Sequence, residues 1–513
     1  MKNFCLALFF LLILVDMISA QEDVNISKKE FKVLKPGFKV AWKHIKEGDA
    51  YYSDGGRLYM NALEEYLKAN EYNNGNDALN YKIGVSYLFS DNKDNAYEFL
   101  IKAFNINNNV SSDILFLTGM SLQYAGRYRD AVDKYLTFLS GAVRKSDNLI
   151  ARANKRLDEC KSALEITKDT LPADIQNAGE KINSYADEYS EILTSDGKKL
   201  YFASRKAIDP NARNYYKDSK LDENIYISEN LGGNWNEALP GGKNLMTAFC
   251  ETPLFIDRSG EVIYVYVGYE GNGDIKYSEL KKGEWKPLKG EPFGLNSKDP
   301  ETSFCISPSG EEIAFVSDRG TSGFGGKDIF FVKRNGQKWS KPVNAGEKIN
   351  TMFNEESVRY SVTGDTLWFS STGHNTIGGF DIFFSIRNSE NSWGPAVNAG
   401  YPINTPWNDL FYIPSPVNRG EFFFVSDRSG GFGGLDLYTG NLDISASPVV
   451  PQTSPAESNA DSLLIRKSAM AEIMDQEPGR QDEPDMESES YRGGSDQAVT
   501  DNSSTGRKAL SKK

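Results

Sequence analysis

Five acidic side chains occupy one position of a repeated segment and are the residues best placed for chemistry. Each lies five residues after the centre of a short motif, best seen as Ile349-Asn350-Thr351 and Ile403-Asn404-Thr405. The five are Glu188, Glu251, Glu301, Glu355 and Asp409. Carboxylates close together raise one another's pKa unless they are paired or bind a cation, so the set fits a metal site or the acid/base pair of a glycosidase. Duplication of a structural position also produces such a set, for example carboxylates that accept backbone N–H bonds where strands begin, and we favour this structural interpretation.

The acids belong to a unit of about fifty residues, seen best in Asp299 to Gly346. That unit holds four short β-prone runs separated by turn signals, a pattern typical of a β-propeller blade. Turn glycines that follow the first run mark five units: Gly197, Gly260, Gly310, Gly364 and Gly420. In propellers the first strand of each blade lines the central channel, so we expect the five acids to form a ring near one mouth.

The order of the runs predicts how the propeller closes. Four units have a tryptophan at the start of the fourth run, but the fifth unit ends near residue 443 without one. Ahead of the first unit, PADIQNAGEKINS (172–184) matches the fourth-run segment WSKPVNAGEKINT (339–351). We therefore expect Asp174 to Asn177 to complete the last blade and to remove an open sheet edge. The five-bladed propeller is predicted to span residues 171–443.

Two glycine-rich stretches in these units, GTSGFGGKD and SGGFGGLD, do not have the features of a nucleotide site. Each leads into a strand, so no helix N-terminus awaits a phosphate. We interpret them as tight connections between the second and third strands.

Residues 37–167 change to a helical period. The triplet Ala96, Leu100 and Ala103 returns 35 residues later as Ala131, Tyr135 and Phe138. A glycine precedes each triplet by twelve residues, which is typical of tetratricopeptide (TPR) repeats, where small residues let paired helices pack closely. We expect a TPR-like solenoid capped by a helix from Asp147 to Ile166. Its concave face would present five side chains, either to a partner or to neighbouring helices: Tyr81, Val85, Phe116, Met120 and Gln123.

The two ends of the chain differ from the repeats. Residues 1–20 have a lysine, an apolar run and a small-residue cleavage site, which together predict a secretory signal peptide. An N-terminal extension, 21–36, follows. Residues 444–513 are polar and acidic, a composition that predicts disorder. The predicted architecture is therefore multidomain α + β: a TPR-like α-solenoid, a five-bladed β-propeller and a disordered tail, with no integral membrane segment in the exported chain.

Charge and residue types restrict the chemistry. The net charge of −13 argues against nucleic acid as a partner. The two histidines, His44 and His374, and four cysteines show no metal-ligand or disulfide spacing. From this shortage we expect no metal, no cofactor and no enzymatic activity.

The repeats with SDRGTSGFGGKDIFF and SDRSGGFGGLDLY resemble WD40-like propellers related to the TolB propeller. Together with a signal peptide and TPR unit, they resemble an exported family of Bacteroidota, one member of which is the periplasmic, outer-membrane-associated component of the type IX secretion and gliding apparatus. Members usually continue into an OmpA-like domain, which we do not find here, so peptidoglycan binding is not implied. The resemblance implies a protein-binding scaffold that is exported to the periplasm, associated with the outer membrane or displayed on the cell surface, with envelope proteins as partners. The alternative is a glycan-binding or glycoside-hydrolysing propeller that uses the acidic ring.

Overall fold

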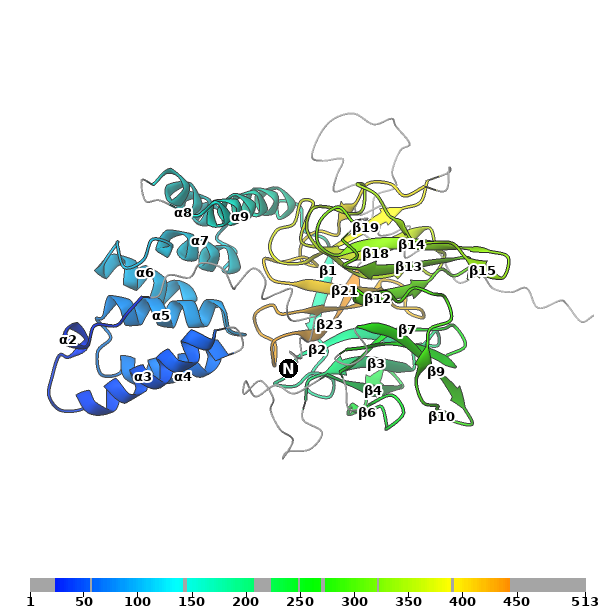
Figure 1. Ribbon diagram of the computed structural model, residues 1–513, viewed down its shortest axis with the longest axis horizontal. Helices are drawn as coiled ribbons and strands as arrows, with labels where there is room; N and C mark the ends of the chain where they lie inside the picture. Colours follow the sequence, from blue (N-terminus) through cyan, green and yellow to red (C-terminus); the bar gives the residue numbers. More distant parts are fainter. Residues whose placement is uncertain are drawn as a thin grey trace, which may run out of the picture. The chain divides into compact units, whose positions relative to one another are not determined.

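The structure is a computed structural model that describes residues 24–55, 58–141, 145–206, 223–247, 250–268, 273–320, 323–388 and 392–442. The chain begins with helices and continues into five β-sheets (Figure 1). This confirms the predicted fold class of a helical region followed by a five-bladed propeller. The predicted signal peptide and the predicted disordered tail lie outside the described residues. Among the helices described, none is long and apolar enough to cross a bilayer.

Eight helices are described before the propeller. They are α2 (Lys28–Phe31), α3 (Phe38–Asp54), α4 (Tyr59–Asn70), α5 (Asp77–Leu88), α6 (Ala96–Ile106), α7 (Ile114–Tyr124), α8 (Tyr128–Ser140) and α9 (Asp147–Ile166). Side-chain caps fix two of the starts, since Asn76 accepts from the Leu79 amide at 2.8 Å and Ser146 accepts from the Leu149 amide at 3.2 Å. Successive helices pack as the pairs α3 with α4, α5 with α6, and α7 with α8.

A glycine lies where each pair is closest. A Cβ atom added to Gly48, Gly84 or Gly119 would come within 2.6 Å of a side chain on the second helix of its pair. The side chains that these glycines meet are Tyr66, Leu100 and Tyr135, respectively. In each pair, therefore, a glycine on the first helix packs against a large side chain on the second helix.

Each blade is an antiparallel sheet. The first three strands of the five blades are β2 (Glu188–Leu193), β3 (Lys199–Ser204) and β4 (Asn224–Leu231); β7 (Glu251–Ile256), β8 (Val262–Val267) and β9 (Asp274–Lys281); β12 (Glu301–Ile306), β13 (Glu312–Ser317) and β14 (Asp328–Asn335); β17 (Glu355–Tyr360), β18 (Thr366–Ser371) and β19 (Asp381–Ile386); and β21 (Asp409–Pro414), β22 (Glu421–Ser426) and β23 (Asp436–Leu442). First strands of neighbouring blades contact one another, so they form the innermost layer.

The fourth strand is split in the first three blades. The pieces are β5 (Asn234–Trp235) and β6 (Leu239–Pro240), β10 (Glu284–Trp285) and β11 (Lys289–Gly290), and β15 (Lys338–Trp339) and β16 (Val343–Asn344). In the fourth blade Trp393 makes an isolated bridge before β20 (Val397–Asn398). A proline follows the tryptophan in three blades, at Pro287, Pro342 and Pro395. Because proline cannot donate to the ladder, it ends the tryptophan piece.

The last blade is completed from the other end of the propeller. Strand β1 (Ala173–Asn177) pairs antiparallel with β23, with Asp174 opposite Asn441 and Asn177 opposite Tyr438. The pairing joins the two ends of the propeller and covers the edge of the last sheet.

The propeller core lies between adjacent sheets. Trp368 of the fourth blade, which is fully buried, stacks on Tyr412 of the fifth with ring centroids 4.1 Å apart. Phe304 and Tyr264 meet similarly between the third and second blades, at 4.7 Å. These aromatic contacts join adjacent blades.

Candidate functional site

The predicted acids all stand at the first position of an innermost strand. Glu188, Glu251, Glu301, Glu355 and Asp409 begin β2, β7, β12, β17 and β21, and none has exposed surface. They share one end of the blades with the connections between second and third strands. We call this end the loop face.

Each acid ties its strand to the segment before it. The Glu355 carboxylate accepts from the Thr351 amide at 3.0 Å, the Thr351 hydroxyl at 2.8 Å and the Ser371 hydroxyl at 2.7 Å. Glu188 accepts from Ser184 and Ser204 in the same pattern. These bonds stay within one blade and match the structural interpretation of the acids. The prediction that the five carboxylates act together in binding or catalysis stays a prediction.

Burial sets the charge of these acids. It raises the pKa of Glu188 and of Glu355 to about 7, because among the residues that the structure describes no cation offsets the loss of solvent at either carboxylate. Burial also raises the pKa of Asp409, although Arg428, at 2.6 Å, opposes that shift. At neutral pH, Glu188 and Glu355 are therefore balanced between their two forms.

One buried ion pair breaks the symmetry of the blades. Lys327 lies 2.5 Å from Glu356, and both side chains are at most 2% exposed. Glu356 also accepts from Thr302 at 3.0 Å. Burial lowers the pKa of Lys327, and Glu356 offsets part of that shift. A sequence signal existed for this pair, since the residues aligned with Lys327 in the next two blades are the apolar Phe380 and Leu435.

The five predicted helical residues are buried. Tyr81, Val85, Phe116, Met120 and Gln123 are at most 3% exposed. The Tyr81 hydroxyl donates to Asp113 at 2.9 Å, and Phe116 packs against Phe138 at 5.7 Å. Neighbouring helices cover four of the five, so their contact with a partner stays a prediction.

Gln123 is different because it contacts the propeller. Its side-chain amide donates to the Ile377 carbonyl at 3.3 Å and to Glu159 of α9 at 2.9 Å. Ile377 itself has no exposed surface and belongs to the apolar core of the helices. The helices and the propeller therefore share one core at this point.

Polar and aromatic contacts surround this shared core. Tyr124 packs on Trp407 with ring centroids 5.2 Å apart, and the Lys93 ammonium lies 4.8 Å from the Trp407 ring centroid. Lys93 also pairs with Asp427 at 3.2 Å, with both side chains about 10% exposed. One part of the loop face is thus an interface with the chain's own helices.

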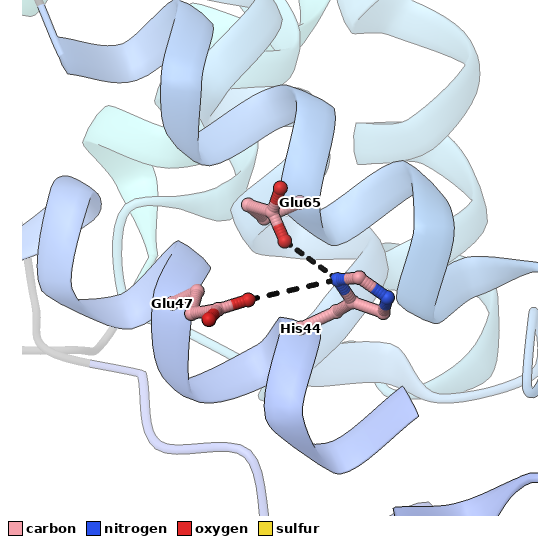
Figure 2. Close-up of side chains that lie close together, drawn as sticks. All are labelled: His44, Glu47 and Glu65. Atoms are coloured by element: carbon pink, nitrogen blue, oxygen red, sulfur yellow. Dashed lines mark hydrogen bonds and ion pairs between the residues drawn. The ribbon is translucent and has the colours of Figure 1, made fainter. Parts of the chain in front are cut away.

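A histidine and two acids meet between α3 and α4 (Figure 2). The His44 Nδ1 atom lies 2.6 Å from Glu65 and 3.8 Å from Glu47. These ligand types suit a metal ion, but lysines already pair with both carboxylates: Lys68 with Glu65 at 2.6 Å and Lys43 with Glu47 at 3.3 Å. Burial would raise the pKa of Glu65, yet hydrogen bonds from Lys68 and His44 hold it below its ordinary value. The geometry is that of an ion-pair network between two helices.

A polar cleft of about 400 Å³ lies between the hairpin turns of the third and fourth blades, at the end opposite the loop face. Its lining includes Glu311, Glu312, Asp365, Lys333 and Arg387. Glu312 holds several of these groups together, since it pairs with Arg387 and with Lys333 and accepts from the Tyr360 hydroxyl at 2.8 Å.

Comparison with known proteins finds solved structures that are similar to this chain in fold. No family model and no curated protein matches the chain. Among solved structures, the endo-arabinase of Bacteroides thetaiotaomicron is 12% identical to this chain, with a TM-score of 0.34. The match covers 53% of this chain and 97% of the endo-arabinase chain. The α-L-arabinofuranosidase of Lactobacillus brevis is 10% identical (TM-score 0.31; 51% and 90% covered), and a GH74 enzyme of Niastella koreensis is 12% identical (TM-score 0.29; 49% and 44% covered).

The comparisons bear on two expectations from the sequence, the absence of enzymatic activity and the membership of a family. The prediction that the chain is not an enzyme is contradicted, because the propellers that it resembles in fold are mostly enzymes. A shortage of histidine and cysteine was poor ground for it, since glycosidases work with carboxylates. Membership of the exported Bacteroidota family stays a prediction.

Proposed function

We propose that this chain is a protein-binding scaffold of the bacterial cell envelope. The observation that carries the proposal is a set of large apolar side chains exposed on the loop face. They are Tyr185, Phe324, Met352 and Phe432, between 51% and 72% exposed. Aromatic residues and methionine are enriched where proteins bind one another, so their exposure on a face that already forms one interface supports a binding role.

The envelope location is supported by the sequence. The signal peptide pattern in residues 1–20 supports export, and the resemblance to exported TPR and propeller proteins supports the periplasm and the outer membrane. In this proposal the partners are envelope proteins, including those of type IX secretion, gliding or outer-membrane assembly.

In-cell crosslinking tests the proposed function. A tagged chain would be expressed in the organism that it comes from, crosslinked through its lysines and purified for mass spectrometry. A version that ends at residue 446 would show which contacts depend on the tail. Recovery of envelope proteins above a tag-only control supports the scaffold, and recovery of cell-wall glycan without any envelope protein contradicts it.

A second candidate is a glycan-binding or glycoside-hydrolysing propeller. The cleft that contains Glu312, Asp365 and Arg387 favours it, because carboxylates and a guanidinium on a concave surface can bind sugar hydroxyls. The acids of the ring suit this role less well, since protein hydroxyls already occupy those carboxylates. Calorimetric titration with envelope and plant oligosaccharides tests it. Loss of binding in Asp365→Asn would support the candidate, and no heat with any sugar would refute it.

A further inference from the structure

Three connections on the loop face have the same construction. Each places an apolar residue before two glycines: Phe324 in the third blade, Ile377 in the fourth and Phe432 in the fifth. The backbone amides of these residues donate to an aspartate four positions later, at 2.5, 3.0 and 2.5 Å, respectively. In each case an asparagine amide also holds that aspartate. The three residues, which we call the tips, are therefore presented in equivalent conformations.

Each tip has a neighbour from the next blade. A Cβ atom added to the glycine after Phe324 would lie 2.2 Å from the carbonyl oxygen of Met352, and after Ile377 it would lie 2.1 Å from that of Pro406. A Cβ atom added to the glycine after Phe432 would lie 2.0 Å from the carbonyl oxygen of Ala186, which follows Tyr185. A tip and its neighbour thus make one apolar unit.

Only the middle unit of the three is covered. Ile377 and Pro406 are buried, and Ile377 belongs to the apolar core of the helices. The Gln123 amide of α7 donates both to the Ile377 carbonyl and to Glu159 of α9. The outer units are open: Phe324 is 51% exposed with Met352 at 72%, and Phe432 is 53% exposed with Tyr185 at 55%. The same construction is therefore seen once with a helix pair bound and twice without one.

We propose that the two outer tips, Phe324 and Phe432, each bind a pair of packed α-helices of a partner protein. The proposal rests on the proposed function and specifies its partner. The bound example defines the chemistry: the tip packs in the apolar core of the helices, and the side-chain amide of one helix donates to the tip carbonyl and to a carboxylate of a second helix. Because the backbones of the three tips are equivalent, the simplest partner for the outer tips is one like the helices that bind the middle tip. The aromatic side chains of the outer tips are larger than isoleucine and would bury more apolar surface.

Site-specific photo-crosslinking tests this inference in the full chain. The probe is p-benzoylphenylalanine at position 324 or 432, with the same probe at Val417 as control. Val417 is 55% exposed but lies on the turn between β21 and β22, at the opposite end of the blade. After irradiation in the native cells, the attached peptides are sequenced by mass spectrometry. A second substitution next to each tip, Met352→Glu or Tyr185→Glu, measures how far the adduct depends on the apolar unit.

We expect adducts from positions 324 and 432 on a second protein, in segments whose apolar residues follow the helical period. The neighbouring glutamate should reduce them about tenfold, while the melting temperature stays unchanged. Adduct yields no higher than at position 417 would overturn the inference, as would adducts on another copy of this chain, on a β-strand or on glycan. In those cases lysine crosslinks to envelope proteins at other surfaces would still support the scaffold, so the two failures are distinguishable.

Discussion

The side-chain amide of Gln123 donates a hydrogen bond to the backbone carbonyl of Ile377, 254 residues further along the chain. Gln123 also accepts from the Tyr135 hydroxyl at 3.0 Å, so its orientation is fixed from the helical side. The bond connects the helical repeats to the propeller at the point where Ile377 enters the helical core. The following predictions test this interface and the groups around it.

Ile377→Ala should destabilise the chain, whereas the equivalent change at an outer tip should not. Removing a fully buried isoleucine side chain costs about 2–4 kcal/mol, because the space left in the interface closes only in part. Phe324→Ala, at an exposed tip, should change the free energy of unfolding by no more than about 0.5 kcal/mol. Urea denaturation followed by tryptophan fluorescence measures both. Equal effects of the two substitutions would contradict the shared core.

Glu355 should make stability depend on pH. Its pKa rises from an ordinary 4.5 to about 7 on folding, so the folded state binds the proton more tightly than the unfolded state does. This contribution is complete below pH 4.5 and is lost as the pH rises through 7, and it amounts to about 3 kcal/mol. Glu355→Gln should therefore reduce the stability difference between pH 5 and pH 8. Urea midpoints at several pH values measure it.

Glu311→Gln is the matched control for this experiment. The Glu311 side chain is 62% exposed, so the substitution should leave the pH profile of the wild type unchanged. A profile for Glu355→Gln that coincides with the wild type would show that Glu355 does not carry the proposed proton.

Gly325→Ala should disturb the loop face, because an added Cβ would lie 2.2 Å from the Met352 carbonyl oxygen. We expect a loss of about 1–3 kcal/mol in the free energy of unfolding. Gly320→Ala, in the same connection, meets nothing within 4 Å and serves as the control. Thermal unfolding of both variants compares them, and a stable Gly325→Ala protein would mean that the two loops are not in contact.

Lys327→Met should be more damaging than removal of the whole pair. The single change leaves the Glu356 carboxylate buried without its lysine and should cost about 3–5 kcal/mol. Adding Glu356→Gln removes that charge and should recover part of the loss. A double-mutant cycle by chemical denaturation gives the coupling, and additive losses would contradict a direct pair.

Much of the propeller was predictable from the sequence, because each blade repeats the same turns. The acids at 188, 251, 301, 355 and 409 begin the first strands, and the match between 172–184 and 339–351 identified the strand that pairs with β23. The split fourth strands were not predicted. There the alignment followed the tryptophans and took no account of the proline that comes two or three residues later in the second, third and fourth blades.

The candidate site was predicted less well, because burial and docking depend on distant residues. The helical period placed Gln123 on a face, but its partner Ile377 lies in another repeat type, which no local pattern could reveal. The acidic ring could be found in the sequence because the acid repeats in every blade. The tips have different side chains and share only their position before two glycines. Their significance came from exposure, which the sequence does not give.

Crosslinking in the native cells, with the wild type compared to Phe324→Glu/Phe432→Glu, tests the central claim most directly. The account predicts that the wild type and a Val417→Glu control recover the same envelope proteins, and that the double variant recovers about tenfold less of them. Recovery of no envelope protein by the wild type, or equal recovery by all three chains, would contradict it.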